Sequence, residues 1–235
     1  MSMRLMKNWT FIKEGKAMLL CGIDDAGRGP VIGPMVLAGV AVAEKDEQKL
    51  AAIGARDSKT LTPLQRERLF GEIIRTSSGY HIVQAAPSEI DEAVNGRDGL
   101  NLNWLEARMT ADIIRALKPQ QAILDCPSNN LGAYKAYVLR LLSDVAVDIV
   151  VAHRADAKYP SVSAASILAK VTRDSEIAKI QARVKEPLGS GYPADPVTVA
   201  FLKRHYEAYP EIFRKSWASY RRVAEKGSQK GLFEF

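Results

Sequence analysis

Cysteine and histidine are scarce in this sequence, which holds two cysteines and three histidines among its 235 residues. The cysteines form no Cys-x-x-Cys motif and no cluster with histidine, which argues against a disulfide framework and against a zinc site. Long hydrophobic runs are also missing. The longest, residues 17–23 and 34–42, are far shorter than the roughly 20 residues that a membrane span needs. No cleavable signal pattern precedes them, so we expect a cytoplasmic protein with no membrane partner.

Internal repeats and low-complexity segments are absent too, and strand-like segments alternate with helix-like ones. This alternation is typical of an α/β fold. A hydrophobic content of 47% is enough for a sizeable core in one domain with at most a small appendage. Lysine and arginine number 33 against 27 acids, and the resulting charge of +6 favours a polyanionic partner such as nucleic acid.

The pattern of hydrophobic residues and of helix caps predicts the order of the elements. Strands are expected over residues 17–24, 35–43, 79–85, 121–126 and 145–153. Helices are expected to begin at Pro63 after a Thr62 cap and at a capping box of Ser88 and Asp91, and to cover residues 102–117, 134–142, 161–184, 197–209 and 211–224. We divide the chain into an N-terminal extension (1–16), an α/β body (17–196), a C-terminal helical part (197–224), and a flexible linker with a tail (225–235).

Two adjacent carboxylates stand where the first strand meets a glycine-rich turn. Residues 22–30 read Gly-Ile-Asp-Asp-Ala-Gly-Arg-Gly-Pro, so Asp24 and Asp25 can converge on one cation only if the strand ends there. Gly27 and Gly29 let the backbone approach an anion closely, and the Arg28 guanidinium adds a phosphate donor. A charged surface turn that merely ends a strand would look the same, so these residues alone leave both interpretations open.

Two further acids lie at the ends of elements. Asp125 ends its strand as Asp24 ends the first one, and Asp156 precedes the long helix. Taken singly, Asp125 is explained as a turn former and Asp156 as a helix cap. Taken together, carboxylates without histidine are typical of a site for Mg²⁺ or Mn²⁺ that leaves room for a substrate phosphate.

Several longer motifs carry a resemblance to a known family. They are Ile-Asp-Asp-Ala-Gly-Arg-Gly-Pro at 23–30, Asp-Ser-Lys at 57–59, Leu-Asp at 124–125, Ala-Asp-Ala-Lys-Tyr-Pro-Ser-Val-Ser-Ala-Ala-Ser at 155–166 and Gly-Ser-Gly-Tyr-Pro at 189–193. In matching order from about Met18 to Trp217, the chain resembles type 2 ribonuclease H in its archaeal form. The resemblance implies a ribonuclease H-like fold with a mixed central sheet flanked by helices and a small C-terminal helical part. It also implies hydrolysis of RNA strands paired to DNA and incision at single ribonucleotides in duplex DNA.

The resemblance also implies roles for individual residues. Two Mg²⁺ or Mn²⁺ ions would activate water and leave 5' phosphate and 3' hydroxyl ends. The backbone at Gly27, Arg28 and Gly29 would read the 2' hydroxyl, while Tyr192 would lie against the sugar beyond the scissile phosphate. The expected ligands are Asp24, Asp25, Asp125 and Asp156, and the expected phosphate contacts are Lys59, Lys158 and Lys170, although each lysine is equally explained as a solvated side chain. We expect the enzyme to act as a monomer.

Asp25 departs from the family pattern, in which the first pair of acids is Asp-Glu. The missing methylene withdraws the second carboxylate by about 1.5 Å, whereas metal coordination tolerates deviations of about 0.2 Å. We keep Asp25 as a ligand and expect weaker catalysis or an altered metal preference.

Two other functions remain open at this point. A catalytically silent protein could keep the basic face and bind duplexes without cleaving them. A different two-metal nuclease on the same fold, such as a junction resolvase or an exonuclease, is the other alternative. The glycine-rich turn and the segment around Tyr192 argue against it, because a general nuclease has no need to read the sugar.

The last seven residues carry one more short motif. Gln229, Leu232 and Phe235 are spaced i, i+3 and i+6, which places them on one face of a 3₁₀ turn. This spacing resembles a peptide that binds the sliding clamp, so a clamp is an expected partner. A tail that folds back onto the body is the alternative.

Overall fold

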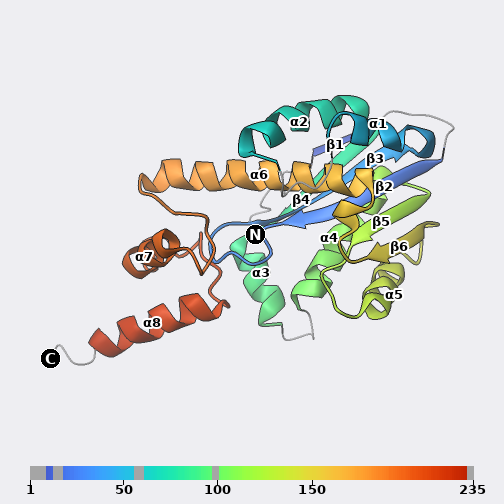
Figure 1. The fold of residues 1–235 in the computed structure, drawn as a ribbon. Helices are drawn as coiled ribbons and strands as arrows, with labels where there is room; N and C mark the ends of the chain where they lie inside the picture. The colour runs from blue at the N-terminus through green and yellow to red at the C-terminus, as the bar shows by residue number, and fades with distance from the viewer. Residues whose placement is uncertain (1–8, 13–17, 56–60, 97–100, 232–235) are drawn as a thin grey trace. The chain divides into compact units, whose positions relative to one another are not determined.

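The computed structural model of the protein describes residues 9–12, 18–55, 61–96 and 101–231, and these residues form two compact units (Figure 1). The units are interleaved along the chain, whereas the sequence analysis divided it into consecutive segments. The described residues of the first unit fall within Met1–Ala26, Val36–Gln84 and Asn103–Thr172, and those of the second within Gly27–Met35, Ala85–Leu102 and Arg173–Phe235.

The strands and helices alternate along the chain as an α/β fold requires. The strands are β1 (Trp9–Ile12), β2 (Leu19–Ala26), β3 (Met35–Ala43), β4 (Gly79–Ala85), β5 (Gln121–Asp125) and β6 (Asp148–Ala152). The α-helices are α1 (Glu47–Ala52), α2 (Pro63–Thr76), α3 (Pro87–Val94), α4 (Leu102–Leu117), α5 (Leu131–Leu141), α6 (Pro160–Val184), α7 (Pro196–His205) and α8 (Ala218–Gly231), and short 3₁₀ helices are η1 (Glu44–Asp46) and η3 (Ala155–Ala157).

The first unit is built on a mixed sheet of six strands in the order β1-β4-β3-β2-β5-β6. Strand β2 lies inside it, antiparallel to β3 and parallel to β5, and β5 is parallel to β6. Figure 1 shows α1, α2 and the start of α6 on one face of this sheet and α4 and α5 on the other. Buried side chains of β2, β3, α2 and α6 form one continuous hydrophobic cluster, so the expected mixed sheet flanked by helices is confirmed.

Local sequence signals account for the best-predicted helices. The Thr62 hydroxyl accepts a hydrogen bond from the Gln65 amide, and the Gln65 side chain accepts one from the Thr62 amide, which together form the capping box that begins α2. Pro63 occupies the first helical position, where its missing N–H costs nothing. Helix α4 has the predicted bounds, and its buried residues lie along one face.

Several predicted boundaries are wrong. Helix α3 begins at Pro87, with the Glu89 side chain accepting from the Ala86 amide, so Ser88 and Asp91 form no capping box. Strand β6 is shorter than predicted, and α5 begins earlier, at Leu131, because Asn130 caps it. The predicted linker at 225–228 belongs to helix α8, and the predicted helix at 211–217 is a turn.

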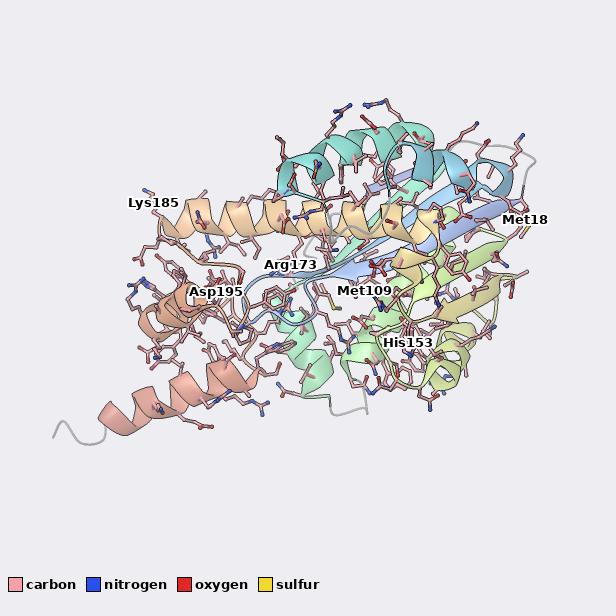
Figure 2. The ribbon with its side chains drawn as sticks, in the orientation of Figure 1. Met18, Met109, His153, Arg173, Lys185 and Asp195 are labelled. Atoms are coloured by element: carbon pink, nitrogen blue, oxygen red, sulfur yellow. The ribbon has the colours of Figure 1, made fainter. Side chains whose placement is uncertain are left out.

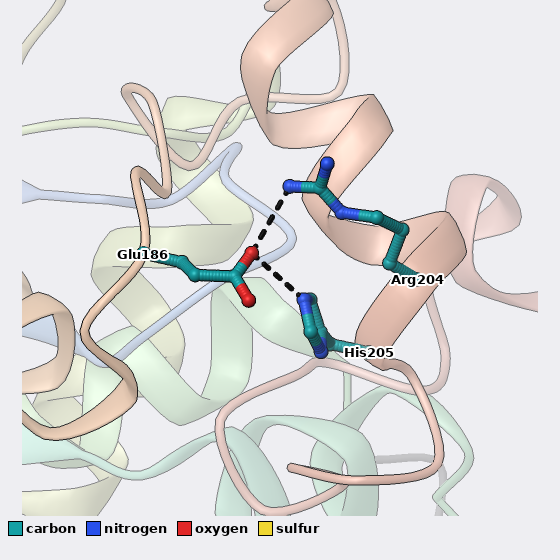
Figure 3. A network of polar contacts seen from close by, with 3 residues as sticks. All are labelled: Glu186, Arg204 and His205. Atoms are coloured by element: carbon teal, nitrogen blue, oxygen red, sulfur yellow. Dashed lines mark hydrogen bonds and ion pairs between the residues drawn. The ribbon is translucent and has the colours of Figure 1, made fainter.

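The second unit has its own aromatic and aliphatic core. Phe201, Phe213 and Leu188 are fully buried in it, and Tyr206 and Tyr220 pack against it. The Glu186 carboxylate, just after α6, accepts hydrogen bonds from Arg204 at 3.1 Å and from His205 at 2.9 Å (Figure 3). This contact ties the end of α6 to the last turn of α7. Within the described part of the chain, the helices are too short or too polar to cross a membrane.

The contact between β2 and α6 depends on Gly22. A Cβ at this position would lie 2.2 Å from the backbone of Ser161 and Val162, much closer than real Cβ atoms approach. Gly22→Ala should therefore lower the free energy of unfolding by about 1–3 kcal/mol or more, measured by thermal and urea denaturation. Gly71→Ala on α2 is the control: its Cβ would meet only the Arg75 guanidinium at 3.4 Å, so we expect a gain of about 0.5–1 kcal/mol. Equal effects of the two substitutions would contradict this packing.

Candidate active site

Two of the predicted acids lie at the same edge of the sheet because their strands run parallel. Ile23 of β2 pairs with Leu124 of β5, and the next residues along these strands are Asp24 and Asp125. Neighbouring parallel strands carry consecutive positions to the same end, so both carboxylates reach one place. This is the juxtaposition that the sequence predicted for Asp24 and Asp125.

Asp156 reaches the same place through the turn that follows β6. Arg154 has a left-handed conformation (φ 55°, ψ 41°), after which the chain forms η3 and enters α6. The Ala155 amide donates a hydrogen bond of 3.2 Å to the Asp125 carboxylate, which holds this turn against the end of β5. Asp156 is the next residue and is only 4% exposed.

The carboxylates of Asp24, Asp125 and Asp156 form one group, with ligand oxygens all within 4.8 Å of one another. Burial raises the pKa of the Asp24 carboxyl well above its ordinary value, and the charge of Asp25 raises it further. A hydrogen bond from the Ser166 side chain on α6 opposes this shift by favouring the ionised form. The group offers only oxygen ligands, two from buried carboxylates and one from the half-buried Asp125, and it fits a hard divalent cation that would relieve their repulsion.

Asp25 is not one of the three residues whose ligand oxygens all lie within 4.8 Å of one another, although its charge acts on the Asp24 carboxyl, so its role as a metal ligand stays a prediction. Asp25 is left out of the group because β2 continues through Ala26, with Asp25 paired to Leu37, and successive residues of a strand point to opposite faces. Asp24 bonds to Ser166 of α6, and the charge of Asp25 acts both on Asp24 and on Tyr134 of α5. Burial is the main cause of the raised pKa of Tyr134, followed by the charge of Glu106, and Asp25 contributes less.

The glycine-rich loop follows Asp25 directly in the sequence and belongs to the second unit. Gly27 has φ +84°, and a Cβ there would meet the Arg173 side chain at 2.3 Å, so both the conformation and the space require glycine. Arg173 projects from α6 (Figure 2) and donates a hydrogen bond of 3.4 Å to the Ile32 carbonyl.

Tyr192 lies beside this loop, as a shared role in substrate recognition would require. A Cβ on Gly29 would approach the Tyr192 ring at 3.2 Å, so the ring covers the loop at that residue. The ring is 44% exposed, and its centroid lies 5.9 Å from the Arg173 guanidinium. Gly29 is exposed and Arg28 is half-buried, so the loop and the ring form one accessible surface.

The remaining predicted residues are more scattered. Lys158 is exposed two residues after Asp156, and Lys170 is half-buried on α6. Lys59 lies outside the described residues, as do Leu232, Phe235 and the side chain of Gln229.

Sequence reasoning missed Ser166 and Arg173. Ser166 was given no role of its own in the sequence analysis, although its side chain bonds to Asp24. Its place in the motif at 155–166 was the available signal. Arg173 is 6% exposed, and nothing in its sequence neighbourhood distinguishes it from the other basic residues of α6.

Comparisons with known proteins show which proteins this chain is similar to in sequence and fold. The family model for ribonuclease HII matches residues 21–220. The ribonuclease HII of Methanocella arvoryzae is 44% identical, with 92% of this chain and 96% of that protein covered. Among solved structures, the ribonuclease H2 of Pyrococcus horikoshii matches with a TM-score of 0.82 and 39% identity over 90% of this chain and all of that one. The ribonuclease HII of Archaeoglobus fulgidus, solved in complex with PCNA, matches with a TM-score of 0.77 and 34% identity over 87% of this chain and 96% of that one.

The raised pKa of Asp24 predicts how the metal-free protein depends on pH. The folded state binds a proton at this carboxyl that the unfolded state has already released, so stability falls as pH rises above the unfolded pKa near 3.8. In the presence of a chelator at pH 7, Asp24→Asn should therefore raise the Tm. The increase should be about 2–4 °C for each kcal/mol by which the free energy of unfolding rises. The gain should vanish near pH 3, and added Mg²⁺ should stabilise the wild type more than the variant.

Asp195→Asn is a control of opposite sign. Its carboxylate accepts hydrogen bonds from the Ser190 and Val197 amides, and the Ser190 contact is the main cause of its lowered pKa. Because a lowered pKa stabilises the folded state at neutral pH, this variant should have a lower Tm there. A metal-free Asp24→Asn protein that melts below the wild type at pH 7 would contradict the electrostatic account of the site.

Proposed function

Because the chain belongs to the ribonuclease HII family, we propose that the group of Asp24, Asp125 and Asp156 is the catalytic centre of a metal-dependent endoribonuclease. Family membership makes this protein an enzyme that hydrolyses the RNA strand of RNA/DNA hybrids. Incision at single ribonucleotides embedded in duplex DNA is the finer activity that we propose for it. The convergence of three carboxylates from separate elements is the observation that carries the assignment.

Divalent metal is the cofactor, and the acids of this site fit it. We propose that the group of three holds Mg²⁺ or Mn²⁺, with two ions in the reactive complex. Bound cations of this kind activate water for in-line attack on phosphorus and stabilise the leaving 3' oxygen, which leaves a 5' phosphate and a 3' hydroxyl. The Ser166 side chain favours the ionised form of Asp24 by bonding to it, and the Ala155 amide orients Asp125.

We assign substrate recognition to the surface formed by the glycine-rich loop and Tyr192. The family resemblance gives 2'-hydroxyl recognition to Gly27, Arg28 and Gly29, and the contact of Tyr192 with Gly29 supports a joint role. Exposed Lys158, half-buried Lys170 and the net charge of +6 would favour the phosphate backbone, together with Lys59.

Loss of a metal ligand provides the direct test. Asp125→Asn and Asp156→Asn remove a charge but little volume, so each should fold and bind duplexes while cleaving at least about 100-fold more slowly. The assay uses a DNA duplex with one ribonucleotide, first in Mg²⁺ and then in Mn²⁺. Near-normal rates in both variants would refute the site. Wild-type protein that binds the duplex but cleaves it in neither metal would instead support the silent duplex-binding alternative.

Asp25 is proposed as an additional acidic residue of the centre, shorter than its family counterpart. Asp25→Glu restores the missing methylene, so its carboxylate should reach further and either raise kcat/KM or extend activity to the less-used metal. Asp144→Glu is the matched control, because this carboxylate is 67% exposed and pairs with Arg115. An inactive Asp25→Glu protein with an unchanged Tm would show that the site has adapted to the shorter acid.

We also propose a sliding clamp as a partner, reached through Gln229, Leu232 and Phe235. Support comes from the spacing of these residues and from the Archaeoglobus fulgidus relative that was solved with PCNA. Because helix α8 runs to Gly231, the motif begins within the last turn of a helix, at Gln229, and not after the flexible linker that the sequence predicted.

Removal of residues 229–235 should abolish binding to an archaeal sliding clamp, measured by calorimetry, and leave cleavage of short duplexes unchanged. Leu232→Ala combined with Phe235→Ala should reproduce the loss, whereas Phe233→Ala, outside the i, i+3, i+6 set, should bind nearly as well as the wild type. A truncated protein with a lower Tm and weaker cleavage in the absence of clamp would show that the tail belongs to the fold.

A further inference from the structure

Arg214 is an arginine with no exposed surface, and it donates three hydrogen bonds to main-chain carbonyls, two in the glycine-rich loop and one at Gly33 shortly after it. Its Nη2 donates to the Gly27 carbonyl at 2.6 Å, its Nη1 to that of Arg28 at 2.9 Å, and its Nε to that of Gly33 at 3.0 Å. Burying a guanidinium is costly, so a contact that only closed a loop could be made more cheaply by neutral donors. The fixed fork of an arginine holds several carbonyls in one geometry.

These hydrogen bonds set the direction of two amides. In a trans peptide the C=O and N–H point in opposite directions, and the described peptide bonds are trans. The Gly27 carbonyl shares its peptide with the Arg28 N–H, and the Arg28 carbonyl shares its peptide with the Gly29 N–H. When Arg214 takes both carbonyls, it turns both N–H groups away from itself.

Trp217 fixes the next carbonyl of the same loop. Its indole Nε1 donates to the Gly29 carbonyl at 2.9 Å, and its ring lies 5.0 Å from the Arg214 guanidinium. The main chain adds further contacts, with the Arg214 amide bonded to Val31 and the Gly33 amide to the Ile212 carbonyl, both at 2.9 Å. The segment 212–217 thus holds the chain between residues 27 and 33 at five positions, three of them in the loop.

The segment that carries Arg214 and Trp217 is itself anchored from another side. The Asp91 carboxylate on α3 accepts hydrogen bonds from the Lys215 and Ser216 amides at 2.8 Å each and from the Ser216 hydroxyl at 2.6 Å. This anchor does not involve the loop. The hydrogen-bond donors of Arg214 and Trp217 are therefore positioned independently of the loop, and the loop carbonyls are oriented by them.

We propose that Arg214, assisted by Trp217, is the positioning residue for 2'-hydroxyl recognition: it aims the Arg28 and Gly29 amides toward the ribose. The inference rests on the proposed function of the glycine-rich loop. Arg214 touches neither substrate nor metal in this account and acts through the loop backbone. Its loss should reduce the preference for ribonucleotides more than it reduces duplex affinity as a whole.

Two variants and one control separate positioning from simple stabilisation. Arg214→Lys keeps the charge but offers no fork, and Trp217→Phe keeps the ring but loses the donor. The control is Phe201→Leu, which removes volume from the buried cluster that Trp217 packs against and alters a side chain that has no donor for a loop carbonyl. Each protein is assayed at the same number of degrees below its own Tm, so that all are compared at similar stability.

Two quantities are measured. The first is the ratio of Kd values for an all-DNA duplex and the same duplex with one ribonucleotide, in an Asp125→Asn background that prevents turnover. The second is kcat and KM for cleavage of the ribonucleotide duplex with Asp125 intact. We expect the Kd ratio to fall about tenfold in Arg214→Lys and about threefold to tenfold in Trp217→Phe, as lost oriented hydrogen bonds predict, while Phe201→Leu keeps the wild-type ratio. The loss should appear mainly in KM.

The Kd ratio could stay unchanged in Trp217→Phe and in any folded Arg214→Lys protein while the wild type still cleaves. This result would overturn the inference about Arg214 and leave the proposed function standing. An equal fall in Phe201→Leu would also overturn it, because the effect would then follow stability. Absence of metal-dependent cleavage by the wild type would overturn the proposed function and, with it, this inference.

Discussion

The parallel pairing of β2 with β5 is the constraint on which the catalytic centre depends. It carries Asp24 and Asp125 to one end of adjacent strands, where their carboxylates must share a small space. The pairing in turn depends on the close packing of α6 on β2. The backbone of Ser161 and Val162 lies so near Gly22 that a side chain at this position would not fit. The same helix supplies Ser166 to Asp24, so one packing contact fixes both the strand and the hydrogen bond that orients its acid.

The electrostatics of the centre explain why it is suited to metal rather than to acid–base catalysis by side chains alone. Burial is the main cause of the raised pKa of the Asp24 carboxyl, and repulsion by the charges of Asp25 and Asp125 adds to it. A divalent cation reverses the balance by making ionised carboxylates favourable. The folded protein therefore holds an arrangement that is unfavourable without its cofactor, which is common where function and stability compete.

In the proposed function, the second unit has a different task, which is to present backbone amides for substrate recognition. Every residue except proline carries the same backbone N–H group, so the direction in which an amide points depends on the groups that surround it. Arg214 and Trp217 do so from one side through carbonyls, while Arg173 and Tyr192 pack against Gly27 and Gly29. Glycine is needed at Gly27 because of its positive φ and the Arg173 contact. The glycine-rich loop is thus held by residues that lie far from it in the sequence.

The sequence by itself determined the α/β class, the capping box at Thr62, the bounds of α4 and the acids at the ends of strands, because caps and hydrophobic periodicity act over a few residues. The family motifs also predicted that Tyr192 and the glycine-rich loop both take part in substrate recognition. Only the tertiary structure decided that Asp25 is left out of the group of three, since that follows from β2 continuing to Ala26. Only it revealed Arg214, whose partners lie more than 180 residues away in the chain. Local patterns fix which residues can form an element, whereas the strand pairing and side-chain burial that bring distant residues together are properties of the whole fold.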